Sequence, residues 1–153
     1  MPKTSAGLLV YRLREGAVEV FLVHPGGPLW AHRDEGAWSI PKGEFDERSE
    51  DPLTAAQREF REETAISISG QFRALAPVRQ AGGKLVRAWS VEGDLDAAAI
   101  RSNHFTLEWP PRSGRLRRYA EIDRAGWFTL PEARRKLNEG QLDLLDQLAA
   151  MQS

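Results

Sequence analysis

Residues 43–66 read GEFDERSEDPLTAAQREFREETAI, an acidic loop followed by a strong helical pattern. Asp51 followed by Pro52 is typical of a helix start, because Asp caps free backbone N–H groups and Pro fits the first helical position. We expect this helix to run to about Thr64. Its apolar stripe, at 100° per residue, is formed by Leu53, Ala56 and Phe60.

Three carboxylates lie beside this stripe. Glu59, Glu62 and Glu63 share an arc of about 100° on the helix surface. Like charges at this spacing destabilise a helix by a few tenths of a kcal/mol, and a hard divalent cation would turn the repulsion into binding. The alternative is a solvated acidic face, in which Arg58 and Arg61 pair with neighbouring glutamates.

Arg58 lies next to these carboxylates. Its guanidinium could hold a carboxylate through two N–H groups, and Glu50 in the preceding loop is a natural partner. The segment therefore predicts a charged network as well as a helix.

The whole segment resembles the Nudix box. The family pattern is Gly, five residues, Glu, seven residues, then Arg-Glu-apolar-any-Glu-Glu-any-Gly-apolar. Gly43, Glu50 and the run from Arg58 to Glu63 occupy the corresponding positions. There are two departures. Six residues separate Gly43 from Glu50, and Ala65 stands where the family has its late Gly.

The resemblance implies a fold and an activity. The fold would be an α/β/α sandwich with a mixed β-sheet, formed by one Nudix hydrolase domain over residues 1–153. The activity would be that of a Nudix pyrophosphohydrolase, which uses Mg²⁺ or Mn²⁺ to hydrolyse a nucleoside diphosphate linked to another moiety. Dinucleoside polyphosphates, nucleotide sugars, ADP-ribose and nucleoside triphosphates are the candidate substrates. The residues around the box are similar to the diadenosine-polyphosphate branch of the family.

The resemblance also assigns roles within the box. Glu59 would orient or deprotonate the attacking water, and Glu50 would act through Arg58 or a metal-bound water. Arg58 would orient the carboxylates. The implied metal ligands are Glu59, Glu62, Glu63 and the backbone carbonyl of Gly43.

Members of this family often use a further carboxylate outside the box as general base. Glu108, before a Pro-Pro loop, and Glu121, before a strand, are the candidates by chain order. The alternative is that both are ordinary surface charges.

Substrate recognition is expected from cations and aromatic rings in loops. Arg112 and Arg115 belong to a cluster with Arg117 and Arg118 that could clamp phosphates. Lys42, beside the box, and Arg33, in the first long loop, are further phosphate contacts. Trp38, like Trp30 and Trp109, could stack on a nucleobase. The alternatives are a solvated basic loop and ordinary core packing.

Hydrophobic periodicity predicts the other elements. Residues 5–13 and 18–23 should form a hairpin, and residues 38–40 a short strand. Further strands are expected at 72–78, 85–91, 104–109 and 121–128, with a helical region after Pro131. This mixture favours an α/β sandwich or an α+β sandwich.

Composition limits the class of protein. The chain has 153 residues, a net charge of −1 and no cysteine. A small nucleotide partner is therefore favoured over bulk nucleic-acid binding, and disulfides and thiolate metal sites are excluded. We expect no membrane span and a cytoplasmic location; the oligomeric state is open.

Two other functions stay open from the sequence. One is a Nudix-fold nucleotide-binding or interaction module without catalysis. The other is an RNA 5′-end pyrophosphohydrolase, for which the arginine cluster at 112–118 is the single candidate basic channel.

Overall fold

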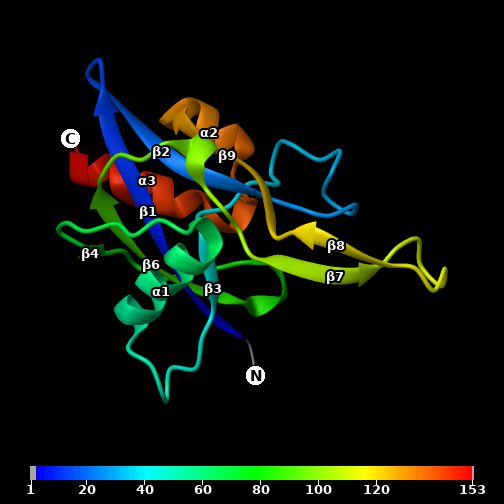
Figure 1. Ribbon diagram of the computed structural model, residues 1–153. Coiled ribbons are helices and arrows are strands. Elements are labelled where there is room, and N and C mark those ends of the chain that lie inside the picture. The colour runs from blue at the N-terminus through cyan, green and yellow to red at the C-terminus, as the bar shows by residue number, and fades with distance from the viewer. Residues whose placement is uncertain (1–2, 153) are drawn as a thin grey trace.

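The computed structural model describes residues 3–152 and shows a twisted mixed sheet between helices (Figure 1). The order of strands is β4-β6-β1-β2-β9, with β3 beside β1 and β5 beside β6. β1 runs parallel to β6, and the other pairs are antiparallel. The strands of this sheet are β1 (Thr4–Arg14), β2 (Ala17–Pro25), β3 (Lys42–Glu44), β4 (Arg73–Ala74), β5 (Val78–Arg79), β6 (Leu85–Glu92) and β9 (Ile122–Thr129).

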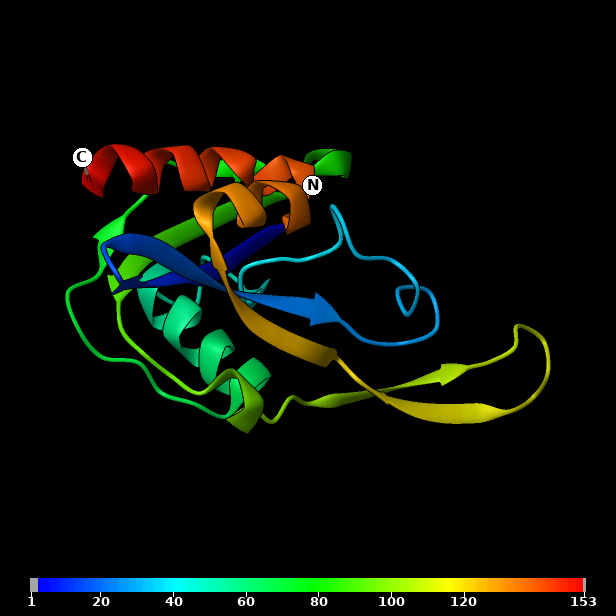
Figure 2. The same ribbon diagram turned by 90° about the horizontal axis from the view of Figure 1, so that it is seen from above.

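Helices cover both faces of the sheet. Figure 2 shows α1 on one side and α2 and α3 on the other. The helices are α1 (Pro52–Thr64), α2 (Leu130–Lys136) and α3 (Leu142–Gln152), with short 3₁₀ turns η1 (Ala81–Gly83), η2 (Ala97–Ala99) and η3 (Glu139–Gln141). The expected α/β/α sandwich with a mixed sheet is confirmed. None of the helices within residues 3–152 has the length and hydropathy that a membrane span would need.

The two-sided cover explains why β1 is buried along most of its length. Leu8 and Val10 point toward α1 and pack in a cluster with Phe60. Leu9 and Tyr11 point the other way, into a cluster that includes Leu144 and Leu148 of α3. A strand covered on both faces reads as a continuous apolar run rather than an alternating one.

Most of the predicted elements are confirmed. The hairpin, the helix from Pro52 to Thr64 and the strands at 85–91, 104–109 and 121–128 are present. The strand predicted at 38–40 is wrong. Those residues make isolated bridges to Val23 and Leu137, and the strand begins instead at Lys42. The stretch 72–78 is not one strand, since it holds β4 and only the first residue of β5.

A separate two-stranded sheet projects from the body of the molecule (Figures 1 and 2). It pairs β7 (His104–Glu108) with β8 (Leu116–Ala120), and we call residues 104–120 the arm. Sequence reasoning missed β8, whereas Arg112 and Arg115 lie in the loop before it, as expected. The backbone N–H of Trp109 donates to the carbonyl of Arg115, which extends the pairing toward the tip.

Candidate active site

Helix α1 is fixed at both ends, which sets the direction of its glutamates. The Asp51 carboxylate accepts from the backbone N–H of Thr54 at 3.1 Å. At the other end Ala65 adopts the left-handed conformation, with φ of 63°, and its N–H donates to Arg61. Phe60 is fully buried under the sheet. The helix therefore cannot rotate without losing its apolar contacts, and its acidic side stays beside β3.

Arg58 ties the carboxylates together. Its Nε and Nη2 donate to the two oxygens of Glu50, both at 2.8 Å. Its Nη1 donates to Glu59 at 2.9 Å and to both oxygens of Glu62 at 3.1 Å. The expected pairing of Arg58 with Glu50 is present, and it is bidentate. Arg58 thereby holds three carboxylates in place.

Glu63 lies on the side of the helix nearest β3. Its Oε2 accepts from the backbone N–H of Lys42 at 3.1 Å. Burial raises the pKa of this carboxyl to about 8, the Lys42 N–H opposes the rise, and the nearby charges of Glu59 and Glu121 add to it. Burial also lowers the pKa of the Lys42 ammonium. Glu63 is thus a partly buried carboxylate whose charge is poorly compensated in the metal-free protein.

Gly43 is in close contact with Glu59. A Cβ atom at position 43 would lie 1.9 Å from Oε2 of Glu59, so any other residue there would displace this carboxylate from its present position. Burial raises the pKa of Glu59, and the Arg58 guanidinium opposes that rise. The absence of a side chain at position 43 therefore leaves the space that the Glu59 carboxylate occupies.

Glu121 is the candidate base that joins this group. A hollow of about 190 Å³ is lined by Lys42, Glu63 and Glu121 together with apolar residues of β2 and β9. Glu108 lies elsewhere: its carboxylate accepts from the backbone N–H groups of Arg112 and Gly114 at the tip of the arm. Glu108 thus does not join the carboxylates beside β3, and its hydrogen bonds brace the tip of the arm.

The carboxylates fit a hard divalent cation by their chemistry. Glu59, Glu62 and Glu63 offer oxygen donors, the type that Mg²⁺ and Mn²⁺ prefer. A bound cation would stabilise the ionised forms of Glu59 and Glu63, which burial disfavours. Within residues 3–152, no three side chains of His, Asp or Glu converge on one point as they stand.

The residues that were expected to contact substrate lie in different parts of the structure. Arg33 is exposed, and its guanidinium lies over the ring of Trp30 at 5.5 Å. Arg112 and Arg115 are exposed near the tip of the arm. Trp38 is 5% exposed and packs against the rings of His24 and Phe128. The base-stacking role expected for Trp38 is corrected accordingly, since its indole belongs to the core.

His24 is a buried residue whose polar contacts were not predicted from the sequence. Its Nδ1 lies 2.7 Å from the carboxylate of Asp123, and its Nε2 lies 2.6 Å from the carbonyl of Arg33. The ring thereby connects β2 to β9 and to the loop after β2. A histidine among apolar strand residues was the available signal, but the partners are distant in sequence.

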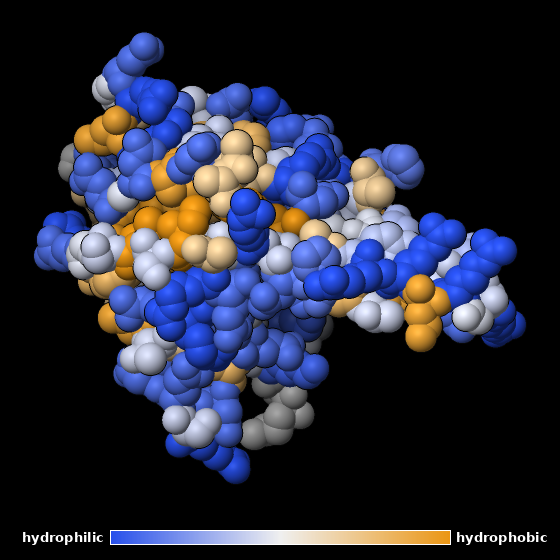
Figure 3. All heavy atoms as spheres, in the orientation of Figure 1, coloured by the Kyte–Doolittle hydropathy of each residue, from blue (hydrophilic) through white to orange (hydrophobic). Residues whose placement is uncertain are grey.

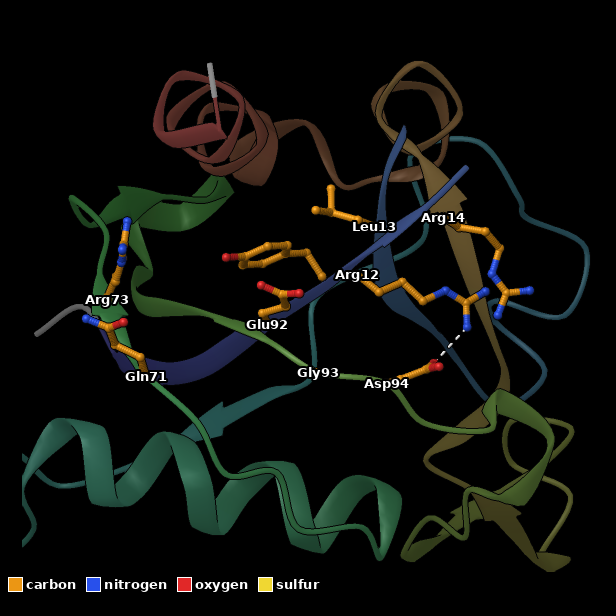
Figure 4. Close-up of a pocket in the computed structure, with 9 residues that line it drawn as sticks. Arg12, Leu13, Arg14, Gln71, Arg73, Glu92, Gly93 and Asp94 are labelled. Carbon is orange, nitrogen blue, oxygen red and sulfur yellow. Dashed lines mark hydrogen bonds and ion pairs between the residues drawn. The ribbon is translucent and has the colours of Figure 1, made fainter. Parts of the chain in front are cut away.

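A larger hollow lies at the other end of β1 (Figure 4). It measures about 620 Å³ and contains Arg12, Arg14, Arg73 and Asp94. Arg12 is already neutralised there by Asp94 and by Glu19, each at 2.8 Å. None of the glutamates of α1 lines this hollow.

Comparison with known proteins agrees with this geometry. The family model of the NUDIX domain matches residues 1–148. The chain therefore belongs to the Nudix family. No sequence among the curated proteins matches it significantly.

Solved structures show the same fold. The C. elegans Ap4A hydrolase in a binary complex has a TM-score of 0.68 and 23% identity, with 98% of this chain and 97% of that chain covered. The Nudix domain of Shewanella oneidensis NrtR complexed with ADP ribose has a TM-score of 0.69 and 15% identity, covering 100% and 90%. The MutT Nudix hydrolase of Burkholderia pseudomallei has a TM-score of 0.60 and 22% identity, covering 97% and 98%.

Proposed function

We propose that this protein uses Mg²⁺ or Mn²⁺ to hydrolyse a pyrophosphate bond in a nucleoside diphosphate linked to another moiety. The observation that carries the proposal is the position of Glu63 and Glu59 beside β3, where Glu63, Lys42 and Glu121 line one hollow. The fold shared with an Ap4A hydrolase and with an ADP-ribose-binding Nudix domain supports a nucleotide-derived substrate.

The proposed ligands are Glu59, Glu62, Glu63 and the carbonyl of Gly43. When bound, the cation would neutralise phosphate charge and lower the pKa of a coordinated water. Arg58 keeps the carboxylates oriented through its bonds to Glu50, Glu59 and Glu62. Because phosphoryl transfer depends chiefly on positioning and charge stabilisation, this rigid network does much of what catalysis requires.

Glu59 and Glu121 are the proposed proton acceptors. Glu59 would orient the attacking water, and Glu121, the residue before β9, lines the hollow beside Glu63. Lys42 also lines this hollow, and its ammonium would contact a phosphate oxygen. Removal of one such preorganised group typically costs two to three orders of magnitude in turnover.

The test is product analysis over a panel of nucleotides. The panel contains diadenosine polyphosphates, ADP-ribose, nucleoside triphosphates and triphosphorylated RNA, each with Mg²⁺, Mn²⁺ or EDTA. We expect turnover of at least one substrate that EDTA abolishes, and the products identify the bond cleaved. Absence of turnover across the panel would contradict the proposal and indicate a nucleotide-binding module without catalysis.

A further inference from the structure

Charge is strongly segregated between the arm and the rest of the molecule. The arm, residues 104–120, has four arginines and one carboxylate, Glu108, so its net charge is +3 with His104 neutral. The whole chain has a net charge of −1, which leaves −4 for the other residues. Figure 3 shows hydrophilic side chains over most of the projecting arm. A positively charged region of this kind attracts polyanions even when the net charge of the whole protein is negative.

The pairing register divides the side chains of the arm into two faces. Opposite residues in an antiparallel pair share a face, and neighbours along a strand alternate. Phe105 pairs with Tyr119, Leu107 with Arg117, and Trp109 with Arg115. We call this set the aromatic face: Phe105, Leu107, Trp109, Arg115, Arg117 and Tyr119. The opposite face carries Thr106, Glu108, Leu116 and Arg118.

The aromatic face has two chemically different columns. The β7 side presents the apolar side chains of Phe105, Leu107 and Trp109, which are partly exposed. The β8 side presents Arg115 and Arg117, which are exposed. Successive positions in a column are about 6.6 Å apart, since a strand rises about 3.3 Å per residue. Two rings, Phe105 and Trp109, lie in the column beside the two cations, with Leu107 between them, and this arrangement resembles the two sides of a single nucleic-acid strand, which are its bases and its phosphates.

The cations of the arm are available for a ligand. No ion pair within residues 3–152 involves Arg112, Arg115, Arg117 or Arg118. The one carboxylate of the arm, Glu108, already accepts from two backbone N–H groups of the tip. These bonds also brace the tip, so the arm needs little ordering on binding.

We propose that the aromatic face of the arm binds single-stranded nucleic acid and leads it toward the carboxylate site. The inference rests on the proposed function only for the second half of that statement. The root of the arm connects the two regions, because the pairing continues from Glu121 to Asn103 and Glu121 lines the hollow beside Glu63. The moiety linked to the diphosphate is then a nucleotide strand.

The first test is fluorescence anisotropy with a labelled single-stranded oligouridine RNA, in EDTA so that no hydrolysis occurs. Arg117→Gln, on the aromatic face, is compared with Arg118→Gln, the adjacent arginine on the opposite face. The two variants lose the same charge. We expect Arg117→Gln to raise Kd about tenfold and Arg118→Gln less than about threefold, because phosphate contacts depend on position as well as on charge.

Stacking is tested separately with Trp109→Leu. Loss of one stacked base should raise Kd for the single strand by about fivefold or more, whereas a duplex of the same sequence should bind weakly to every variant. Circular dichroism and thermal unfolding check that each variant is folded. Equal effects of Arg117→Gln and Arg118→Gln, preference for the duplex, or no detectable binding would overturn the inference.

The two proposals fail in different ways. If the binding pattern holds but no substrate is hydrolysed, the proposed function falls and nucleic-acid binding by the arm stands. If Arg117→Gln impairs hydrolysis of a diadenosine polyphosphate but leaves RNA binding unchanged, the occupant of the arm is a dinucleotide, and the inference is overturned.

Discussion

The backbone N–H of Lys42 donates to Oε2 of Glu63 across 3.1 Å, and this bond joins β3 to α1. It fixes one oxygen of the carboxylate beside the sheet. Because β3 pairs with β1, the position of Glu63 is set by the core of the protein rather than by the helix alone.

Stability of the metal-free protein should fall as pH rises. The pKa of Glu63 is raised from 4.5 to about 8 by burial, so the folded state binds the proton more tightly than the unfolded state. The stabilisation is complete below the unfolded pKa and is lost as pH passes the folded pKa, with a slope of up to about 1.4 kcal/mol per pH unit. Urea unfolding in EDTA at several pH values between the two pKa values measures the slope.

Glu63→Gln is the control for this pH dependence, because glutamine resembles the protonated acid. The free energy of unfolding of the variant should fall less steeply with pH than that of the wild type. Equal slopes for the two proteins would show that Glu63 does not titrate in this range.

Ala65→Gly should stabilise the protein. Ala65 has φ of 63°, a conformation that costs a residue with a Cβ roughly 1 kcal/mol relative to glycine. We expect the free energy of unfolding to rise by about 0.5–1 kcal/mol. Ala149→Gly, at an exposed position of α3, should have the opposite sign because its backbone is helical. A loss of stability in Ala65→Gly would contradict the strain at this position.

Gly43→Ala should damage the site without unfolding the protein. The new Cβ would meet the carboxylate of Glu59 at 1.9 Å, whereas the backbone of Gly43 is not in the left-handed region. Displacement of Glu59 by about 1 Å can lower turnover about 100-fold. Gly93→Ala is the matched control, since its Cβ would meet neighbours no closer than 3.6 Å. Turnover of Gly43→Ala within a few-fold of the wild type would contradict the proposed contact.

Arg58→Lys should lower activity more than stability. Lysine keeps the charge but cannot bond both oxygens of Glu50 while also reaching Glu59 and Glu62. We expect turnover and metal affinity to fall about 10- to 100-fold. The comparison variant is Arg87→Lys, which alters an exposed pair with Glu47. Similar turnover in the two variants would show that the Arg58 network does not position the carboxylates.

The sequence was sufficient to predict those elements whose pattern is local. Asp51-Pro52 and the apolar stripe ending at Phe60 located α1, because capping and amphipathicity are local properties. β8 was missed because it packs against no core face, so its sequence, LRRYA, shows no alternating apolar pattern. The strand expected at 38–40 failed because its backbone groups bond both to β2 and to the end of α2.

The candidate site shows the same division between local features and those that depend on long-range contacts. The pairing of Arg58 with Glu50 could be predicted, since both residues belong to one motif and are close together in the sequence. The bond from Lys42 to Glu63 could not, because it depends on where β3 pairs with β1. The different positions of Glu108, at the tip of the arm, and Glu121, at the hollow, could not be predicted either, because they depend on how the arm leaves the sheet.

The most direct test of the central claim is the turnover of Glu63→Gln against that of the wild type, across a Mg²⁺ titration with the best substrate of the panel. The wild type should gain activity with Mg²⁺ and lose it in EDTA. The folded variant should lose at least about a hundredfold in turnover at saturating metal. Turnover of Glu63→Gln within about tenfold of the wild type, or activity that EDTA leaves unchanged, would contradict a metal-dependent hydrolase centred on this carboxylate.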